Sequence, residues 1–175
     1  MPADWTRPVD VERLADVGES REGEVALASL PRLAADLARS EGHAVARIDF
    51  ARERGQPVAR ISVRARVPLR CQRCLQPVWI DCDTHSTLWL VTDPAKAEVG
   101  EGNEMGLEPT LAAGGRVALS ELVEEELLLA VPLVPRHEDV RECGVAVEAA
   151  APPPREDEAA QRPFAGLGEL LKRGK

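Results

Sequence analysis

The clearest pattern in the chain is an alternation of apolar and polar residues between Ala59 and Leu69. Ile61, Val63 and Val67 belong to the apolar set, and arginines occupy most of the positions between them. A period of two residues places the two sets on opposite faces of a β-strand. Weaker alternation extends to the segments on either side. We therefore expect strands near residues 21–29, 43–51, 57–70 and 76–91, and their hairpin spacing indicates an antiparallel sheet.

Two other stretches have apolar residues at helical spacing. The first runs from Leu30 to Ser40, with Pro31 acceptable in a first helical turn. The second covers residues 119–131, with Ser120 as a candidate N-cap. Its apolar stripe should cover the inner face of the sheet. The residues expected at that contact are Ile61, Val63, Val67 and Leu69 on the sheet, and Leu122, Val123 and Leu127 on the helix.

These elements predict an α+β fold, in which a twisted antiparallel sheet that could curl toward a barrel is covered by two main helices. Residues 1–20 are expected to form an N-terminal arm, and residues 21–143 a single domain. Residues 94–115 hold five glycines and several glutamates, which is typical of an acidic loop. The segment after Cys143 is rich in Ala, Pro and Glu. Residues 144–175 are therefore expected to be a flexible tail, with a disordered linker and a short terminal amphipathic helix.

The overall composition sets limits on the partners of the protein. The formal charge is −8, and aromatic residues make up only 3% of the chain. An acidic balance argues against nonspecific attraction to nucleic acid or to an anionic membrane surface. No apolar stretch approaches the length of a membrane span, and the N-terminus lacks the pattern of a secretory signal. We expect a soluble cytoplasmic protein that is not associated with a membrane.

Cys71 and Cys74 form a C-x-x-C pair at the end of the strand predicted over residues 57–70. Two sulfurs at this spacing can bind one metal ion, and a tetrahedral zinc site needs two more ligands. The downstream candidates are Cys82, His85, His137 and Cys143. Of these, His137 and Cys143 would complete a Cys3His site. A strand-end turn with partly buried thiols explains the pair equally well, whereas a redox pair would be expected at the start of a helix.

Arginines crowd into the same part of the chain. Residues 47–73 contain eight arginines and two acids, so this segment carries about +6 within a chain of −8. Arginine at alternate strand positions can follow a row of phosphates. The alternative is that these arginines pair with the chain's own glutamates, such as those of residues 98–108, and no aromatic residue accompanies them for stacking on bases. The candidate surface for RNA or another partner consists of Arg60, Arg64, Arg66, Arg70 and Arg73.

No pattern in the chain predicts an enzyme. Four glutamates at positions 121, 124, 125 and 126 could bind a divalent metal, but a solvated polar face of the predicted helix explains them as well. His137 has no Ser or Cys nucleophile at a recognisable spacing, and we find no phosphate-binding loop. We therefore expect no catalytic activity.

Three segments in a fixed order are informative when taken together. They are residues 67–75 (VPLRCQRCL), residues 117–137 (VALSELVEEELLLAVPLVPRH), and residues 162–167 (RPFAGL) followed by a basic end. The combination resembles the YceD-like family, the large ribosomal RNA subunit accumulation proteins, over most of residues 57–175.

The resemblance implies a role in the synthesis, processing or stability of 23S ribosomal RNA in the bacterial cytoplasm or in organelles, and it implies no catalytic residue. We therefore expect a ribosome-biogenesis factor that acts by binding a ribosomal RNA precursor or a ribosomal or assembly protein. The alternative is a small zinc-stabilised structural adaptor that contacts only protein. Zinc is the one cofactor that the sequence suggests.

Overall fold

The computed structural model describes residues 4–95 and 106–144 of the 175-residue chain. The expected linker and tail, apart from Gly144, and half of the expected acidic loop lie outside the described residues. The described elements are β1 (Pro8–Asp10), α1 (Val11–Val17), β2 (Ser20–Ala26), α2 (Pro31–Ala34), β3 (His43–Glu53), β4 (Gln56–Arg70), β5 (Pro77–Val91), β6 (Glu108–Leu111), β7 (Arg116–Ala118) and α4 (Leu119–Ala130). Three short 3-10 turns complete the list, at Leu27–Ser29, Ala113–Gly115 and Val140–Cys143.

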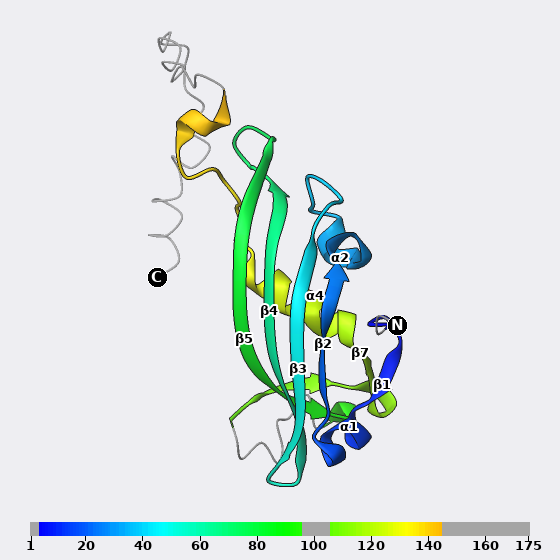
Figure 1. Cartoon of the computed structure of the whole chain (residues 1–175). Coiled ribbons are helices and arrows are strands. Elements are labelled where there is room, and N and C mark those ends of the chain that lie inside the picture. Colours follow the sequence, from blue (N-terminus) through cyan, green and yellow to red (C-terminus); the bar gives the residue numbers. More distant parts are fainter. Residues whose placement is uncertain (1–3, 96–105, 145–175) are drawn as a thin grey trace, which may run out of the picture. The chain divides into compact units, whose positions relative to one another are not determined.

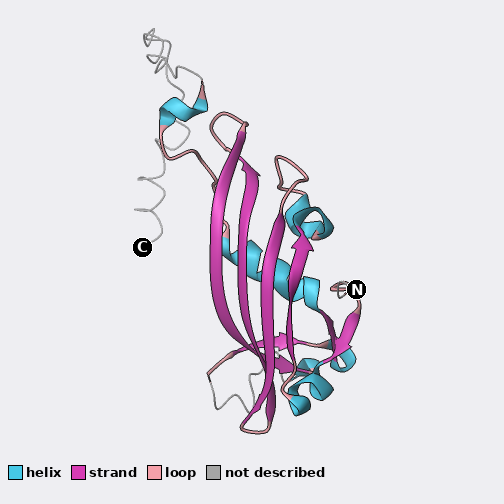
Figure 2. Ribbon diagram, viewed as in Figure 1, coloured by secondary structure: helices cyan, strands magenta, loops and turns pink. Residues whose placement is uncertain are grey.

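The main sheet has five strands in the order β2-β3-β4-β5-β6 and curls along its length (Figures 1 and 2). The first four strands are antiparallel neighbours, and β6 joins the last residues of β5 in parallel. All four strands expected from the sequence are present, and the α+β prediction is confirmed. A separate pair, β1 with β7, lies at one end of the domain.

A two-residue turn fixes the register of β3 and β4. Arg54 and Gly55 both have positive φ angles, of 49° and 79°, and Glu53 lies opposite Gln56. Two consecutive left-handed residues match the right-handed twist of the strands that they join. The register matters because a slip by one residue would turn every apolar side chain of β4 to the opposite face.

α4 crosses the inner face of the sheet (Figure 1), as the sequence predicts. Val63 and Val67 are fully buried on β4, and Val123 and Leu127 are fully buried on α4. The other residues expected at this contact, Ile61, Leu69 and Leu122, are buried as well. None of the helices in the described residues is long and apolar enough to cross a bilayer.

The helix expected from Leu30 to Ser40 is much shorter in the structure. α2 ends at Ala34, because the chain then turns to run beside β4. The backbone N–H of Ala38 donates to the Pro68 carbonyl at 2.7 Å, and Leu37 forms an isolated bridge with Leu69. Pairing with the sheet therefore replaces the later turns of the expected helix.

Residues 1–20, expected to be an arm, contain β1 and α1. The side chain of Asp10 caps α1 by accepting from the Arg13 N–H, and Gly18 ends the helix at a φ of 64°. Val11 and Leu14 on this helix are buried in the core. In the segment expected to be a loop, the structure likewise has the four-residue strand β6 and the 3-10 turn at Ala113–Gly115.

The expected N-cap role of Ser120 is wrong. α4 already begins at Leu119, and its cap residue Ala118 makes no side-chain hydrogen bond. The Ser120 N–H instead donates to the Trp5 carbonyl at 2.9 Å, so a backbone group from the N-terminal segment satisfies a donor in the first turn.

The glutamates of α4 are not all solvated, contrary to expectation. Glu124 is 97% buried, and its Oε1 accepts from the backbone N–H groups of Arg32 and Leu33 at the start of α2. Its Oε2 accepts from Arg32 Nε at 3.1 Å. A carboxylate at a helix N-terminus satisfies donors that the helix itself leaves free. Glu124 therefore connects α4 to α2.

We expect Glu124→Ala to lower the free energy of unfolding by about 3 kcal/mol, because it leaves buried N–H donors of α2 without acceptors. Urea titration would measure the loss. Glu125→Ala is the matched control, since Glu125 makes a half-exposed ion pair with Arg32 and should cost less than about 1 kcal/mol. Equal losses in the two variants would contradict the capping role.

Candidate functional site

The four residues predicted as metal ligands converge in the structure. Cys71 and Cys74 lie in the turn between β4 and β5, and His137 and Cys143 lie in the segment that follows α4. Their ligand atoms all lie within 4.8 Å of one another. Segments more than sixty residues apart in sequence therefore meet at one point, which the sequence suggested but did not establish.

The turn that carries the first two cysteines has the geometry of a small knuckle. The Cys71 N–H donates to the Gln76 carbonyl at 2.9 Å, and the Leu75 N–H donates back to the Cys71 carbonyl at 2.8 Å. Leu75 has a φ of 62°, which reverses the chain immediately after Cys74. These bonds hold both sulfurs on the same side of the turn.

The separations within the group fit a tetrahedral ion. Nδ1 of His137 lies 3.6 Å from Sγ of Cys74 and 3.6 Å from Sγ of Cys143. Zinc bonds of about 2.3 Å to sulfur and about 2.0 Å to nitrogen, at a tetrahedral angle, place those two atoms about 3.6 Å apart. All four cysteines are free thiols. Three thiols and one imidazole form a ligand set that suits structural zinc.

His137 is oriented for ligation by its second nitrogen. Nε2 lies 3.1 Å from the Pro77 carbonyl, which can only accept a hydrogen bond. Nε2 therefore carries the proton, and the lone pair of Nδ1 faces the sulfurs. A further bond, from the Gln72 N–H to the Pro135 carbonyl at 2.8 Å, joins the knuckle to the segment that carries His137.

The protein environment favours the thiolate form at Cys71. Burial raises the pKa of this thiol, but backbone N–H groups of Cys74, Arg73 and His137 that point at its sulfur lower the pKa to about 5. By contrast, burial and the neighbouring sulfur of Cys74 raise the pKa of Cys143. Zinc binds thiolate rather than thiol, so a preformed thiolate at Cys71 suits a metal ligand.

The other candidate ligands lie elsewhere. Cys82 is buried on the inner face of β5, where burial, followed by the charge of Asp81, raises the pKa of its thiol. His85 is exposed on the outer face, next to Asp83. Within residues 4–95 and 106–144, the Cys3His cluster is the one group of such side chains close enough to share a metal ion.

The arginines of β4 lie on the outer face of the sheet, as predicted, and most of them have partners. Arg64 pairs with Asp83 at 3.2 Å, and Arg66 pairs with Asp81 at 3.6 Å across the β4–β5 register. Of the remaining predicted contact residues, Arg60 pairs with Glu53. Arg70 has no ion pair in the described part of the chain. Nη1 of Arg73 lies 3.6 Å from Sγ of Cys143.

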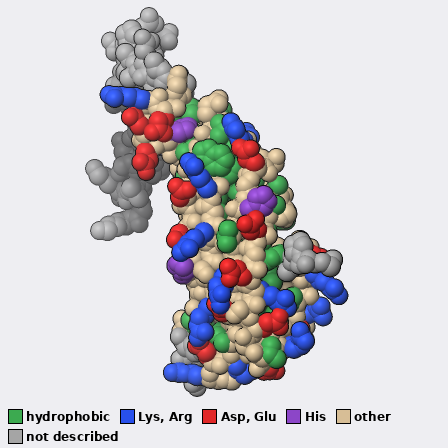
Figure 3. All heavy atoms as spheres, in the orientation of Figure 1, with side chains coloured by type: hydrophobic (Ala, Val, Ile, Leu, Met, Phe, Trp, Pro, Cys, Tyr) green, Lys and Arg blue, Asp and Glu red, His purple; other side chains and the backbone are tan. Residues whose placement is uncertain are grey.

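The strand registers show that the outer face is balanced in charge. It carries Arg47, Arg60, Arg64, Arg66 and Arg70 together with Glu22, Glu24, Asp49, Glu53, Asp81 and Asp83. Figure 3 shows this face, where basic and acidic side chains alternate over the strands. The positive charge concentrated in residues 47–73 is therefore offset on this face by acidic residues of β2, β3 and β5.

An aromatic residue accompanies the arginines, contrary to the sequence analysis. Trp79 lies on the outer face of β5, 38% exposed, with the Arg66 guanidinium 5.2 Å from its ring centroid. A hollow of about 700 Å³ beside it is also lined by Arg136 and His137. Trp79 follows the arginine segment in sequence, and only the β4–β5 register brings it next to Arg66.

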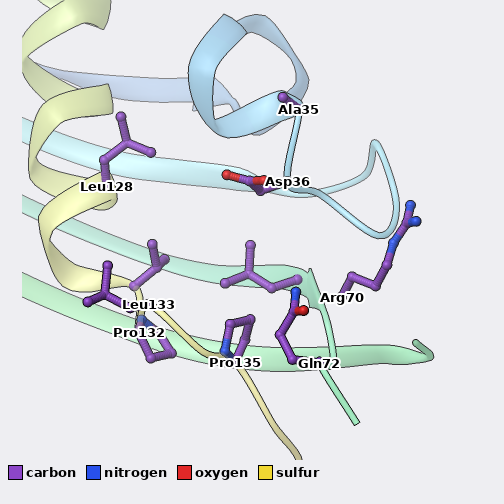
Figure 4. Close-up of a pocket in the computed structure, with 10 residues that line it drawn as sticks. Ala35, Asp36, Arg70, Gln72, Leu128, Pro132, Leu133 and Pro135 are labelled. Carbon is purple, nitrogen blue, oxygen red and sulfur yellow. The ribbon is translucent and has the colours of Figure 1, made fainter. Parts of the chain in front are cut away.

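A second pocket, of about 430 Å³, lies next to the knuckle. Figure 4 shows that its lining comes from three segments: the residues after α2, the end of β4 with the turn that follows it, and the last turn of α4 with the loop that follows it. Arg70 and Gln72 contribute polar groups, and Leu128 and Leu133 contribute apolar ones. Arg70, which lacks an ion pair among the described residues, thus lies between this pocket and the outer face.

Comparison with known proteins yields one match. Searches of curated proteins and of solved structures returned no match. The family model for "Large ribosomal RNA subunit accumulation protein YceD" matches residues 59–171, which include most of β4, all of β5 and α4, and all four members of the Cys3His cluster. This match covers well over half of the chain and agrees with the resemblance seen in the sequence. The chain belongs to the YceD family of large ribosomal RNA subunit accumulation proteins.

Proposed function

We propose that this protein supports the accumulation of large-subunit ribosomal RNA by binding to an RNA precursor, without catalysing a reaction. The family description carries the general role. The contact surface is the outer face of the sheet around Arg64, Arg66 and Trp79. This surface combines guanidinium groups, which bind phosphate, with an exposed indole, on which a base can stack.

The ion pairs on this face do not prevent it from binding phosphate. The side chains of Arg64 and Arg66 are 73% and 67% exposed, and those of Asp83 and Asp81 are similarly exposed. Exposed pairs of this kind contribute only about 0–1 kcal/mol each. A phosphate can therefore replace a carboxylate partner of an arginine at little cost in free energy. Because the acids also repel phosphate, we expect binding only of RNA that additionally contacts Trp79 and Arg70.

We further propose that the Cys3His cluster binds one zinc ion with a structural role. The ion would be held by Cys71, Cys74, His137 and Cys143, and would fix the loop after α4 against the β4–β5 turn. Four protein ligands leave no open position for water or substrate, which is typical of structural rather than catalytic zinc. The cluster thus keeps His137 and Arg136 beside the hollow next to Trp79.

A second candidate function is a zinc-stabilised adaptor that contacts only protein. The charge balance of the outer face favours it, because mixed charges around a tryptophan and several arginines are also typical of protein interfaces. In that case the ribosomal role would depend on a ribosomal or assembly protein as the direct partner.

We expect Arg64→Glu together with Arg66→Glu to abolish co-sedimentation with pre-ribosomal particles while leaving the fold intact. Charge reversal removes two phosphate contacts and introduces repulsion, which should weaken binding at least about 100-fold. Trp79→Ala should weaken it about tenfold by removing one stacking platform.

The matched control is Arg13→Glu with Arg39→Glu, which makes the same change in net charge at exposed arginines away from this face. Circular dichroism would verify folding of each variant. Unchanged co-sedimentation of the Arg64/Arg66 variant would refute the assigned surface. Binding that is insensitive to nuclease treatment would favour the protein adaptor instead.

For the metal centre, we expect one zinc per chain in protein purified without added metal, measured by elemental analysis. Chelation should lower Tm by about 10 °C, because it removes the free energy of binding that stabilises the folded state. Cys74→Ser should lose the metal and show the same lower Tm without chelator.

Cys82→Ser serves as the control, since Cys82 is a buried cysteine outside the cluster. It should retain one zinc and respond to chelation as the parent does. Absence of zinc combined with a melting curve that chelators do not alter would show that the cysteines form an ordinary turn.

A further inference from the structure

A groove on the opposite side of the sheet from the arginine face is not used by the proposed function. It has a volume of about 690 Å³ and lies between α4 and β6, with residues from the start of α2 at one end. The α4 side is formed by Glu121, Leu122, Glu125 and Leu129, which recur at the spacing of one helical face. The groove therefore follows the length of α4.

The floor of this groove is apolar and partly open to solvent. Leu129 is 74% exposed and Leu111 is 43% exposed, which is unusual for leucines that face the same hollow. Leu122 and Val117 continue the floor as buried residues. Apolar side chains gathered in a groove commonly mark a contact surface, whereas isolated exposed leucines do not.

The rim of the groove is strongly acidic. Among the described residues that line the groove are Glu121, Glu124, Glu125 and Glu126, against a single cation, Arg32. Glu124 is occupied as the cap of α2, and Glu126 accepts from the Ser86 hydroxyl. Glu121 and Glu125 are exposed, and the ion pair between Glu125 and Arg32 is itself half-exposed, so a basic side chain of a partner can reach both carboxylates. The net field over the apolar floor is negative.

We propose that this groove binds a basic amphipathic segment of a partner protein. Its leucines would pack against Leu111 and Leu129, and its lysines or arginines would pair with Glu121 and Glu125. An amphipathic helix laid in a groove is a common mode of recognition, and this groove combines an apolar floor with an acidic rim. RNA does not fit this surface, because phosphates would be repelled by the rim.

This inference goes beyond the proposed function, because the arginine face and the groove lie on opposite sides of one sheet. The two surfaces can be tested separately. A protein partner in the groove is compatible with either of the two functions proposed above.

The test is site-specific photo-crosslinking in cells that produce the full-length chain. Leu129→p-benzoylphenylalanine places the reactive group over the groove, and Val17→p-benzoylphenylalanine places it at a similarly exposed apolar position on α1. Mass spectrometry would identify the crosslinked peptide. We expect a peptide from another protein at position 129, with apolar residues at helical spacing and several lysines or arginines, and not at position 17.

Adding Glu121→Lys and Glu125→Lys should reduce that crosslink at least about tenfold, because the rim then repels a basic segment. Adding Arg64→Glu and Arg66→Glu should leave it unchanged, which separates this result from any failure of the RNA-binding surface. A crosslink within the same chain, to a second copy, to RNA or to an acidic peptide would overturn the proposal. So would a crosslink that persists after charge reversal, or the absence of any crosslink.

Discussion

The packing of α4 against the inner face of β4 is the contact on which the other features of this domain depend. Val63 and Val67 on the strand and Val123 and Leu127 on the helix are all fully buried. Burial of four such side chains supplies several kcal/mol, although part of it is offset by lost conformational entropy. The position of α4 then determines where its two ends lead. At the start of α4, the Ser120 N–H donates to the Trp5 carbonyl. After the end of α4, the chain runs to the β4–β5 turn, where the Gln72 N–H donates to the Pro135 carbonyl.

The Cys3His cluster extends this arrangement. The knuckle alone provides two ligands, and the segment after α4 alone provides two, so neither half can hold a tetrahedral ion. They meet because α4 crosses the sheet and because Gln72 bonds to the Pro135 carbonyl. A bound metal would cost little further ordering here, since the Pro77 carbonyl already orients His137. The cluster would therefore act mainly on the loop that borders the outer face.

Much of the fold could be predicted from the sequence, because strand alternation and strand length are local properties. The four long strands and the inner face of β4 follow from that pattern. The shortened α2, the capping role of Glu124 and the position of Trp79 beside Arg66 could not be predicted, since each depends on tertiary contacts. The same reason explains the cysteines. Their spacing suggested a site, but only the path of the chain after α4 brings His137 and Cys143 to it.

The distribution of charge shows why net charge is a poor guide to the partners of this protein. The chain is acidic overall. On the outer face, acids of neighbouring strands offset the charge of the β4 arginines. Beside the groove, the glutamates of α4 outnumber the cations among the described lining residues. A sheet with an apolar inner face keeps these two fields apart, since α4 and the core separate them. A single domain can therefore present a phosphate-compatible face and a cation-compatible groove at once. Such an arrangement fits the two proposals above, in which the outer face binds RNA and the groove binds a basic segment of a protein.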